Sequence, residues 1–248
     1  MFNLHHGDCV TYMKSIPDNS IDCVITDCPY HIVAGGCSTN ANEPKGMLRR
    51  RLRDCEAMNK AAQQGKVFEY NEIKFEEWLP EVYRILKEDT HCYIMINSRN
   101  LKELQEKAES VGFIFQNLLV WKKNNATPSQ FYMNQCEYVL LLRKGRARYI
   151  NNLGTMNFFE VPNIIGDKLH PTEKPVNLMK IFVQNSTNEG DLVMDPFMGS
   201  GSTGCACKEL NRNFIGCEID DKYFEIAESR INGTAIKTSE NYIQGELF

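Results

Sequence analysis

The segment DPFMGSGST, from Asp195 to Thr203, decides the fold because it joins a strand-like run, Leu192–Met194, to a helical pattern. Glycines at such a turn let the backbone approach a ligand closely, since no Cβ intervenes and a positive φ is allowed. The turn lacks the lysine of a phosphate-binding loop and does not follow a GxGxxG pattern. A zwitterionic ligand fits it better, with Asp195 pairing with an ammonium group. The residues assigned to this candidate site are Asp195, Phe197, Gly199, Ser200 and Gly201.

A second acidic residue, Glu218, ends the next strand-like run, Phe214–Cys217. A carboxylate at this position, about 20 residues after a glycine turn, can accept hydrogen bonds from both vicinal hydroxyls of a ribose. Taken alone, a glycine turn is more often structural, and a glutamate at a strand end is usually solvated. Their spacing instead predicts a site for a nucleoside-type cofactor.

Short apolar runs alternate with helical patterns along the chain, which predicts an α/β protein with a mostly parallel sheet. The apolar runs Phe113–Trp121 and Glu137–Leu142 are joined by a polar loop without a helical pattern. We therefore expect them to form an antiparallel pair at the sheet edge. Helical spacing of apolar residues predicts a helix over Phe75–Leu86, with a polar exit at Lys87–Thr90. The expected strands are Phe2–His5, Cys23–Thr26, Cys92–Ile96, Phe113–Trp121, Glu137–Leu142, Leu192–Met194 and Phe214–Cys217. Further expected helices are Asn100–Val111, Pro175–Asn185, Thr203–Leu210 and Lys222–Ile231.

The chain has 248 residues, of which 42% are hydrophobic, and this suits one domain with an elaboration. We expect a single catalytic domain over residues 1–235, interrupted by a basic insertion at about 33–67, and a tail over 236–248. No run approaches the roughly 20 apolar residues that span a bilayer. The opening MFNLHHGD has no signal-peptide pattern, so a cytoplasmic protein without membrane contact is expected.

The 10 cysteines are scattered without CxxC pairs, and several lie inside apolar runs. Buried free thiols in a reducing compartment explain them better than disulfides or a zinc site, so no metal is expected.

A third motif, Asp27-Cys28-Pro29-Tyr30, ends the strand-like run CVIT. Together with DPFMGSGST, it resembles the amino-methyltransferase family, whose fingerprint is (D/N/S)PP(Y/F). The order of the motifs along the chain resembles the β class of DNA methyltransferases, as do the opening segment HHGDCVTYMKSIPDNSIDCVITD and the hexapeptide HPTEKP, His170–Pro175. The resemblance implies a circularly permuted Rossmann-like sheet with S-adenosylmethionine bound at the carboxyl ends of the strands.

The resemblance also implies site residues. Asp8 is expected near the cofactor adenine, and Thr172 and Lys174 near its methionine end, with Asp27 at the border of the cofactor site. From the residues alone, Thr172 is equally plausible as a helix N-cap, with Pro175 placed where no amide donor is needed. Lys174 has the alternative of a surface lysine. The catalytic set is Asp27, Cys28, Pro29 and Tyr30.

The chemistry requires these residue types because the lone pair of an exocyclic base amine is delocalised into the ring. The Asp27 carboxylate and the main-chain carbonyl of residue 28 can each accept one N–H, which leaves the lone pair facing a sulfonium methyl. A base inside a duplex must be flipped out to reach this pocket, and Tyr30 offers an aromatic face for stacking. Cys28 departs from the family pattern, because it keeps the carbonyl but loses the fixed φ of proline.

The net charge of −4 argues against indiscriminate nucleic-acid binding, but basic residues are clustered. The candidate DNA contacts are Lys45, Arg49, Arg50, Arg51, Arg53, Lys122 and Lys123. A solvated helix face is the alternative for such clusters. The expected recognition segment, about 146–169, is short for an independent module. The basic insertion or a second subunit of a homodimer is expected to share the task.

The favoured activity is methylation of adenine N6 in DNA, because the resemblance associates Asp at the first catalytic position with adenine and Ser with cytosine N4. The alternatives are cytosine-N4 methylation, methylation of RNA or a protein amide, and a non-catalytic nucleic-acid-binding subunit that has lost transfer through Cys28. A restriction–modification enzyme of a bacterium or phage is expected.

The last five residues, Gln244-Gly245-Glu246-Leu247-Phe248, resemble the Q-x-x-L-F peptide that binds the bacterial sliding clamp. Such a peptide inserts two adjacent apolar side chains into a preformed pocket. A tail that folds back onto its own core or frays is the alternative.

Overall fold

Eight strands form one sheet in the computed structural model, which describes residues 1–29, 73–127, 132–164 and 173–234. Neighbouring strands are parallel, except that β5 is antiparallel to both β3 and β4. In spatial order, the strands are β1 (Phe2–His6), β8 (Asn213–Glu218), β7 (Leu192–Asp195), β2 (Ile21–Asp27), β3 (Leu86–Ile96), β5 (Asn134–Lys144), β4 (Ile114–Thr127) and β6 (Phe158–Glu160).

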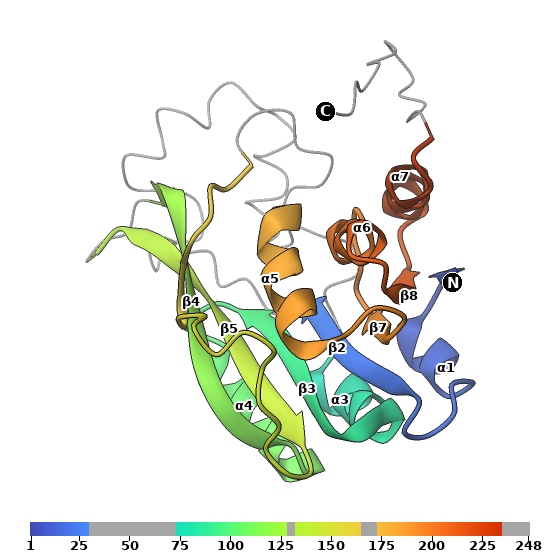
Figure 1. Cartoon of the computed structure of the whole chain (residues 1–248), viewed down its shortest axis with the longest axis horizontal. Helices are drawn as coiled ribbons and strands as arrows, with labels where there is room; N and C mark the ends of the chain where they lie inside the picture. The colour runs from blue at the N-terminus through green and yellow to red at the C-terminus, as the bar shows by residue number, and fades with distance from the viewer. Residues whose placement is uncertain (30–72, 128–131, 165–172, 235–248) are drawn as a thin grey trace, which may run out of the picture.

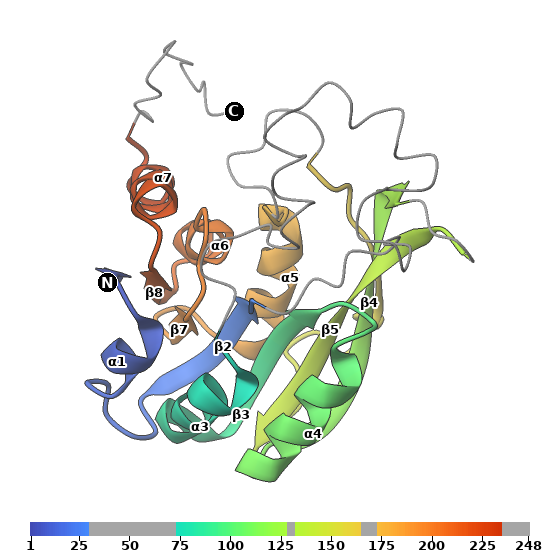
Figure 2. The same ribbon diagram turned by 180° about the vertical axis from the view of Figure 1, so that it is seen from behind.

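Helices cover both faces of this sheet, so the domain has three layers (Figures 1 and 2). One face carries α1 (Cys9–Met13), α3 (Phe75–Ile85) and α4 (Leu101–Val111); the other carries α5 (Val176–Ser186), α6 (Ser202–Glu209) and α7 (Asp221–Asn232). Alternate residues of a strand serve the two apolar cores, as the period of two requires. In β3, Ile94 and Ile96 enter the first core, and Tyr93 and Met95 enter the second.

The antiparallel strand does not lie at the sheet edge, and in this respect the sequence prediction was wrong. β4 and β5 are antiparallel as predicted, but β5 lies between β3 and β4. The edge is the three-residue strand β6, which pairs in parallel with Val120–Lys122 of β4. Three residues are too few to show a strand period, so the sequence carried no signal for β6.

The other expected elements are present with shifted ends. α1 was missed, because its five residues are too few to display a helical stripe. β3 begins at Leu86, so that the expected polar exit Lys87–Thr90 belongs to the strand. Pairing with β2 explains this: Leu86 is in register with Ile21, and the ammonium of Lys87 lies 2.6 Å from the Asp22 carboxylate. Tertiary contacts override the local polar character here.

Buried free cysteines are confirmed within the described residues. Cys9, Cys23, Cys28, Cys92, Cys207 and Cys217 are buried, and Cys136 and Cys205 are partly buried. Cys37 and Cys55 lie outside the described residues. No helix in the described ranges is long and apolar enough to cross a membrane.

The strand order reverses between β2 and β7. From β2 the chain continues through α3 to β3 on one side, whereas from β7 it continues through α6 to β8 on the other. The intervening helices lie on opposite faces of the sheet (Figures 1 and 2). In open α/β sheets, such a reversal leaves a crevice outside the carboxyl ends of the strands, where ligands bind. The fold therefore places the ends of β2 and β7, Asp27 and Asp195, at the expected ligand site.

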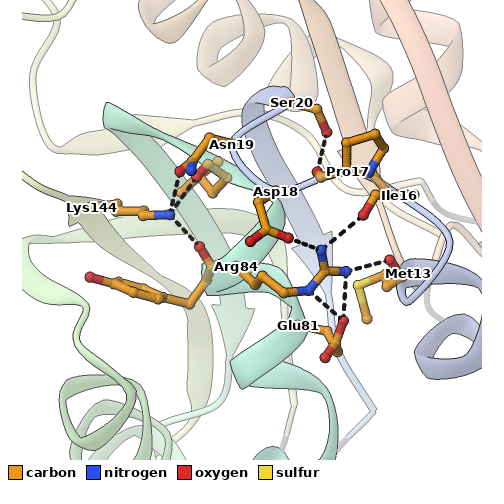
Figure 3. Close-up of polar contacts among 11 residues, drawn as sticks. Met13, Ile16, Pro17, Asp18, Asn19, Ser20, Glu81, Arg84 and Lys144 are labelled. Carbon is orange, nitrogen blue, oxygen red and sulfur yellow. Dashed lines mark hydrogen bonds and ion pairs between the residues drawn. The ribbon is translucent and has the colours of Figure 1, made fainter.

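Two cations hold the opposite end of the sheet together (Figure 3). The guanidinium of Arg84 in α3 donates to the carbonyls of Met13 and Ile16 and to the carboxylates of Asp18 and Glu81. The ammonium of Lys144 donates to Asn19 Oδ1 and to the carbonyls of Tyr83 and Leu86, at 2.7–2.9 Å. These bonds attach the α1–β2 connection to α3 and to the start of β3.

The substitution Lys144→Met should lower the free energy of unfolding by about 2–4 kcal/mol, because it leaves buried carbonyls without a donor. Only 6% of the Lys144 side chain is exposed. Urea denaturation followed by circular dichroism measures the effect. Arg146→Gln is the control, since it breaks only an exposed ion pair with Asp89 and should leave stability nearly unchanged. Equal losses in the free energy of unfolding of the two variants would contradict a stabilising role of the Lys144 hydrogen bonds.

Candidate active site

Asp195 ends β7 and joins it to the neighbouring strand. Its Oδ1 accepts hydrogen bonds from Thr26 Oγ1 at 2.7 Å and from the Phe197 amide at 3.1 Å, and its Oδ2 accepts one from Thr203 Oγ1 at 2.8 Å. The carboxylate thus holds the end of β2, the turn and the start of α6 in one place. Burial raises its pKa to about 6, although the hydroxyl donors oppose this shift.

The turn after Asp195 requires glycine. Gly199 and Gly201 have φ angles of +51° and +81°, in the left-handed region that L side chains rarely adopt. A Cβ on Gly201 would lie 3.1 Å from the Ala227 Cβ and from the Ile231 Cδ1, both in α7. The sequence DPFMGSGST therefore forms the glycine turn that its residues predict, with Gly199 partly exposed and Gly201 packed against α7.

Glu218 lies beside this turn at the end of β8. Its Oε2 accepts the Gly199 amide at 2.9 Å, and its Oε1 accepts the amides of Ile219 and Asp220 at 3.0 and 2.9 Å. Burial raises the pKa of this carboxyl, and the three amides oppose the shift. The contacts fix the orientation of the group that the sequence assigned to a ribose.

Asp8 lies at the same edge of the sheet, because β1 is the parallel neighbour of β8 and the Gly7 amide donates to the Glu218 carbonyl at 2.9 Å. Asp8 is the N-cap of α1, and its Oδ1 accepts the Thr11 amide at 2.7 Å. Hydrogen bonds from the Thr11 side chain and, less strongly, from its amide lower the pKa of Asp8, which keeps it ionised. Its contact with the cofactor stays a prediction.

Asp27, at the end of β2, is paired with Lys174. The Lys174 ammonium donates to Oδ2 of Asp27 and also lies 3.7 Å from the Glu137 carboxylate. Oδ1 of Asp27 has no hydrogen-bond partner within the described ranges. Burial raises the pKa of Asp27, while Lys174 opposes this shift. Lys174 is buried rather than on the surface, so the alternative of a surface lysine is excluded.

The departure from the family pattern, Cys28, is buried in the first core. Its thiol donates to the Met95 carbonyl of β3 with an S–O distance of 3.8 Å. Burial raises the pKa of this thiol well above its usual range, so it is neutral and unreactive. The side chain attaches the end of β2 to the next strand, at the position where the family has a proline ring. Pro29 follows it, and Tyr30 lies outside the described residues.

Two site residues were missed from the sequence. Arg230 in α7 donates to the Ser200 carbonyl at 2.6 Å and to its hydroxyl at 2.9 Å, and forms an ion pair with Glu173 at 2.9 Å. The second missed residue is Glu173, which immediately precedes Lys174 in the sequence. The spacing of Arg230 within α7 is ordinary, so only the tertiary packing of α7 against the turn reveals the contact.

Phe197 packs edge-to-face on Trp78 of α3, with ring centroids 5.3 Å apart. Both tryptophans, Trp78 and Trp121, are buried. Phe197 thus joins the cofactor turn to the first core. This contact accounts for an aromatic residue in the turn, and its role toward the cofactor stays a prediction.

The candidate DNA contacts are only partly described. Lys122 pairs with Glu160 at 3.0 Å, and Lys123 with Glu137 at 2.8 Å, with 13% of the Lys123 side chain exposed. Each lysine thus has a carboxylate partner, and contact of either with phosphate stays a prediction. Lys45, Arg49, Arg50, Arg51 and Arg53 lie outside the described residues, as do Thr172 and the tail. Pro175 is the N-cap of α5, so Thr172 does not occupy that position.

The expected recognition segment is described as far as residue 164, and it packs against the sheet. Its strand β6 pairs with β4, and the Val161 carbonyl accepts from the indole of Trp121 at 2.7 Å. Asn163 binds both Asn124 and Asn125 of β4. These contacts integrate the segment into the domain.

The donor set at the carboxyl edge fits a cationic nucleoside cofactor. The strand ends carry Asp8, Asp27, Asp195 and Glu218, whereas Lys174 and Arg230 are already paired with carboxylates. Such an excess of carboxylates disfavours a phosphate and favours a sulfonium or ammonium group. Glu218 lies beside the glycine turn, and its role as the acceptor for ribose hydroxyls stays a prediction.

A doubly wound sheet with the carboxylate of Glu218 beside a glycine turn is typical of transferases that bind a nucleoside cofactor. A sequence model of the DNA methylase family N6_N4_Mtase matches residues 21–229. The chain therefore belongs to this family. It is an S-adenosylmethionine-dependent DNA methyltransferase that acts on an exocyclic base amine.

Individual relatives agree with this assignment. The chain is 28% identical over 263 residues to the Type II methyltransferase M.HinfI of Haemophilus influenzae, covering 96% of the chain and 70% of the relative. It is 27% identical over 247 residues to the Type II methyltransferase M2.DpnII of Streptococcus pneumoniae, covering 92% and 88%.

Solved structures agree as well. The M1.HpyAVI–SAM complex has a TM-score of 0.66 and 27% identity, covering 93% of this chain and 100% of that one. The cytosine-N4-specific PvuII DNA methyltransferase has a TM-score of 0.68 at 19% identity, covering 92% and 86%, and shares the fold.

The substitution Asp195→Asn tests the buried carboxylate. The folded pKa of about 6 exceeds the unfolded value of 3.8. The folded state therefore binds the proton more tightly, and Asp195 lowers stability progressively as the pH rises between these two values. Asparagine can bond both threonine hydroxyls without titrating. The free energy of unfolding of the variant, minus that of the wild type, should grow from pH 4 to pH 7.

Urea denaturation at pH 4, 5.5 and 7 without cofactor measures this difference. Glu218 titrates in both proteins, so its contribution cancels, and the repulsion between Asp195 and Asp27 is part of the measured difference. A difference in free energy of unfolding that does not change with pH would contradict the raised pKa of Asp195.

Proposed function

We propose that this enzyme methylates N6 of adenine in DNA, with Asp27 as the residue that binds the target amine. The observation that carries the proposal is the geometry of Asp27 at the switch point, where Lys174 holds Oδ2 and Oδ1 is open within the described ranges. Aspartate at the first position of D-x-P-Y favours adenine by resemblance to the family. Two Type II methyltransferases are among its relatives, which suits a site-specific enzyme of a restriction–modification system.

The open oxygen suits the chemistry of an exocyclic amine. Oδ1 of Asp27 accepts one N–H of the target, and the main-chain carbonyl of Cys28 accepts the other. With both hydrogens bound, the lone pair of the nitrogen is directed away from the two acceptors. The Cys28 thiol maintains the position of that carbonyl through its bond to Met95. Tyr30 stacks on the flipped base.

S-adenosylmethionine supplies an electrophilic methyl group on its sulfonium. Glu218 would accept the ribose hydroxyls, the turn Gly199–Ser200–Gly201 would lie beside the ligand, and Asp8 would contact its adenine. Thr172 and Lys174 would serve its methionine end. Asp195 holds the turn through the two threonine hydroxyls and contributes negative potential for the cationic cofactor.

Segments outside the carboxyl ends of the strands bind the DNA backbone. The basic insertion at about 33–67, with its cluster Lys45–Arg53, binds phosphates, helped by Lys122 and Lys123. The segment at about 146–169 contributes to target recognition. The catalytic domain spans 1–235 and the tail 236–248.

The proposal also includes protein partners and a cellular location for the enzyme. A homodimer supplies further recognition surface, and the tail Gln244–Phe248 binds the bacterial sliding clamp. The enzyme acts in the cytoplasm of a bacterium or of a phage-infected cell, where its substrate is present.

Nucleoside analysis tests the choice of base. DNA from a methylation-deficient host that expresses the protein should contain N6-methyladenine, because the family resemblance associates aspartate at position 27 with adenine. Liquid chromatography with mass spectrometry measures both modified nucleosides, and the empty vector is the control. N4-methylcytosine in place of N6-methyladenine would overturn the proposal.

The substitutions Asp27→Ala and Asp27→Asn should lower methyl transfer at least about a thousandfold, because both remove the anionic acceptor for the target amine. Asparagine retains the shape of the site and tests whether the loss follows from the charge. Cofactor affinity should change little, since Asp27 serves the target. Tritiated methyl transfer and calorimetry measure the two quantities.

Asp22→Asn is the matched control, because Asp22 lies at the opposite end of β2, where it pairs with Lys87. Near wild-type transfer by the Asp27 variants would exclude Asp27 from catalysis.

A further inference from the structure

Two consecutive residues, Glu173 and Lys174, contact opposite parts of the active site. Both are buried, with 7% and 8% of their surfaces exposed. Glu173 forms an ion pair with Arg230 at 2.9 Å, whereas Lys174 forms one with Asp27. One peptide bond therefore joins the carboxylate that pairs with a cation of α7 to the ammonium that pairs with the end of β2.

Arg230 extends this link to the cofactor turn. One nitrogen of its guanidinium, Nη1, donates to both the carbonyl and the hydroxyl of Ser200, and the other, Nη2, faces the Glu173 carboxylate. A planar guanidinium can make both contacts at once in a fixed geometry, which a flexible ammonium cannot reproduce. A displacement of Ser200 is thus transmitted to Glu173.

Lys174 extends the link to the catalytic turn. Its ammonium holds Oδ2 of Asp27 and also faces Glu137 of β5, whose other oxygen accepts from Lys123 at 2.8 Å. A buried ammonium between two carboxylates keeps its charge: burial lowers the pKa of Lys174, but Asp27 and Glu137 outweigh it and raise that pKa above its usual value. The position of Asp27 therefore depends on where residue 174 lies.

We propose that Ser200, Arg230, Glu173, Lys174 and Asp27 form a continuous brace that couples the cofactor turn to the amine-binding carboxylate. Arg230 and Glu173 are positioning residues, since neither reaches the target base and each acts through its neighbour. The inference rests on the proposed role of Asp27. Its consequence is that the cofactor turn and the acceptor of the target amine keep a fixed separation, as in-line transfer requires.

The substitutions Arg230→Lys and Glu173→Gln test the brace in the full chain. Arg230→Lys keeps the charge but cannot bind Ser200 and Glu173 together. It should raise the Kd of S-adenosylmethionine about tenfold, through loss of charged hydrogen bonds to the turn. It should also lower kcat about tenfold at saturating cofactor, because Asp27 is misplaced. Glu173→Gln should lower kcat in the same way.

The matched control is Arg212→Lys. Arg212 donates to Thr187 and to the Leu210 carbonyl, and it contacts neither turn. This variant should lower Tm without changing Kd or kcat. Equal effects of Arg212→Lys and Arg230→Lys would overturn the brace, as would an unchanged kcat in Arg230→Lys.

The pH profile of kcat separates positioning from general destabilisation. Burial raises the pKa of Asp27, Lys174 opposes that shift, and Glu137 adds to it. Within the described ranges, the other charged groups near Asp27 are Lys123, which pairs with Glu137, and Asp195. Lys174→Met should move the acidic limb of kcat to higher pH, and Lys174→Arg should restore it. A uniform loss at all pH values would overturn the role of Lys174.

A double-mutant cycle provides a readout that needs no methyl transfer. If the brace is continuous, Arg230→Lys and Lys174→Met together should raise the Kd of S-adenosylmethionine less than the product of their separate effects. Independent effects would overturn the coupling. The tritium assay counts transfer to any base, so a target other than adenine N6 would defeat the proposed function and leave the brace intact.

Discussion

The buried carboxylate of Asp195 is the constraint on which the rest of the site depends. It accepts hydrogen bonds from one threonine on β2 and another on α6, and so holds together the two strands between which the sheet reverses. Burial makes its ionisation unfavourable, and the hydroxyl donors only partly compensate. Asp27 and the glycine turn are consequently neighbours at one edge, although most of the chain separates them in sequence.

The carboxyl edge of the sheet carries more negative than positive charge. The strand ends contribute carboxylates, and the cations that approach them, Lys174 and Arg230, each form an ion pair. A sulfonium cofactor meets an acidic surface, and electrostatic attraction then adds to the fit of the glycine turn. The phosphates of DNA gain no electrostatic attraction from these carboxylates, and the basic cluster Lys45–Arg53 belongs to another segment of the sequence.

Cys28 illustrates how one departure from a family pattern is accommodated. A proline would set φ by its ring, whereas the cysteine side chain enters the first core and bonds to the Met95 carbonyl. Both arrangements limit the freedom of the carbonyl at residue 28. The raised pKa keeps the thiol neutral, so that the substitution introduces no new nucleophile beside the cofactor.

The sequence by itself determined the α/β class, the glycine turn and the strand that ends at Asp27, because these depend on local periodicity and on residue types with narrow conformational ranges. It also predicted the β4–β5 pairing, since only a short loop joins those runs. The tertiary structure alone decided that β6 covers the edge, that Lys123 and Lys174 lie in a charge network, and that Arg230 holds Ser200. These features join residues far apart in the chain, and their energies come from burial and charge, which no local pattern encodes.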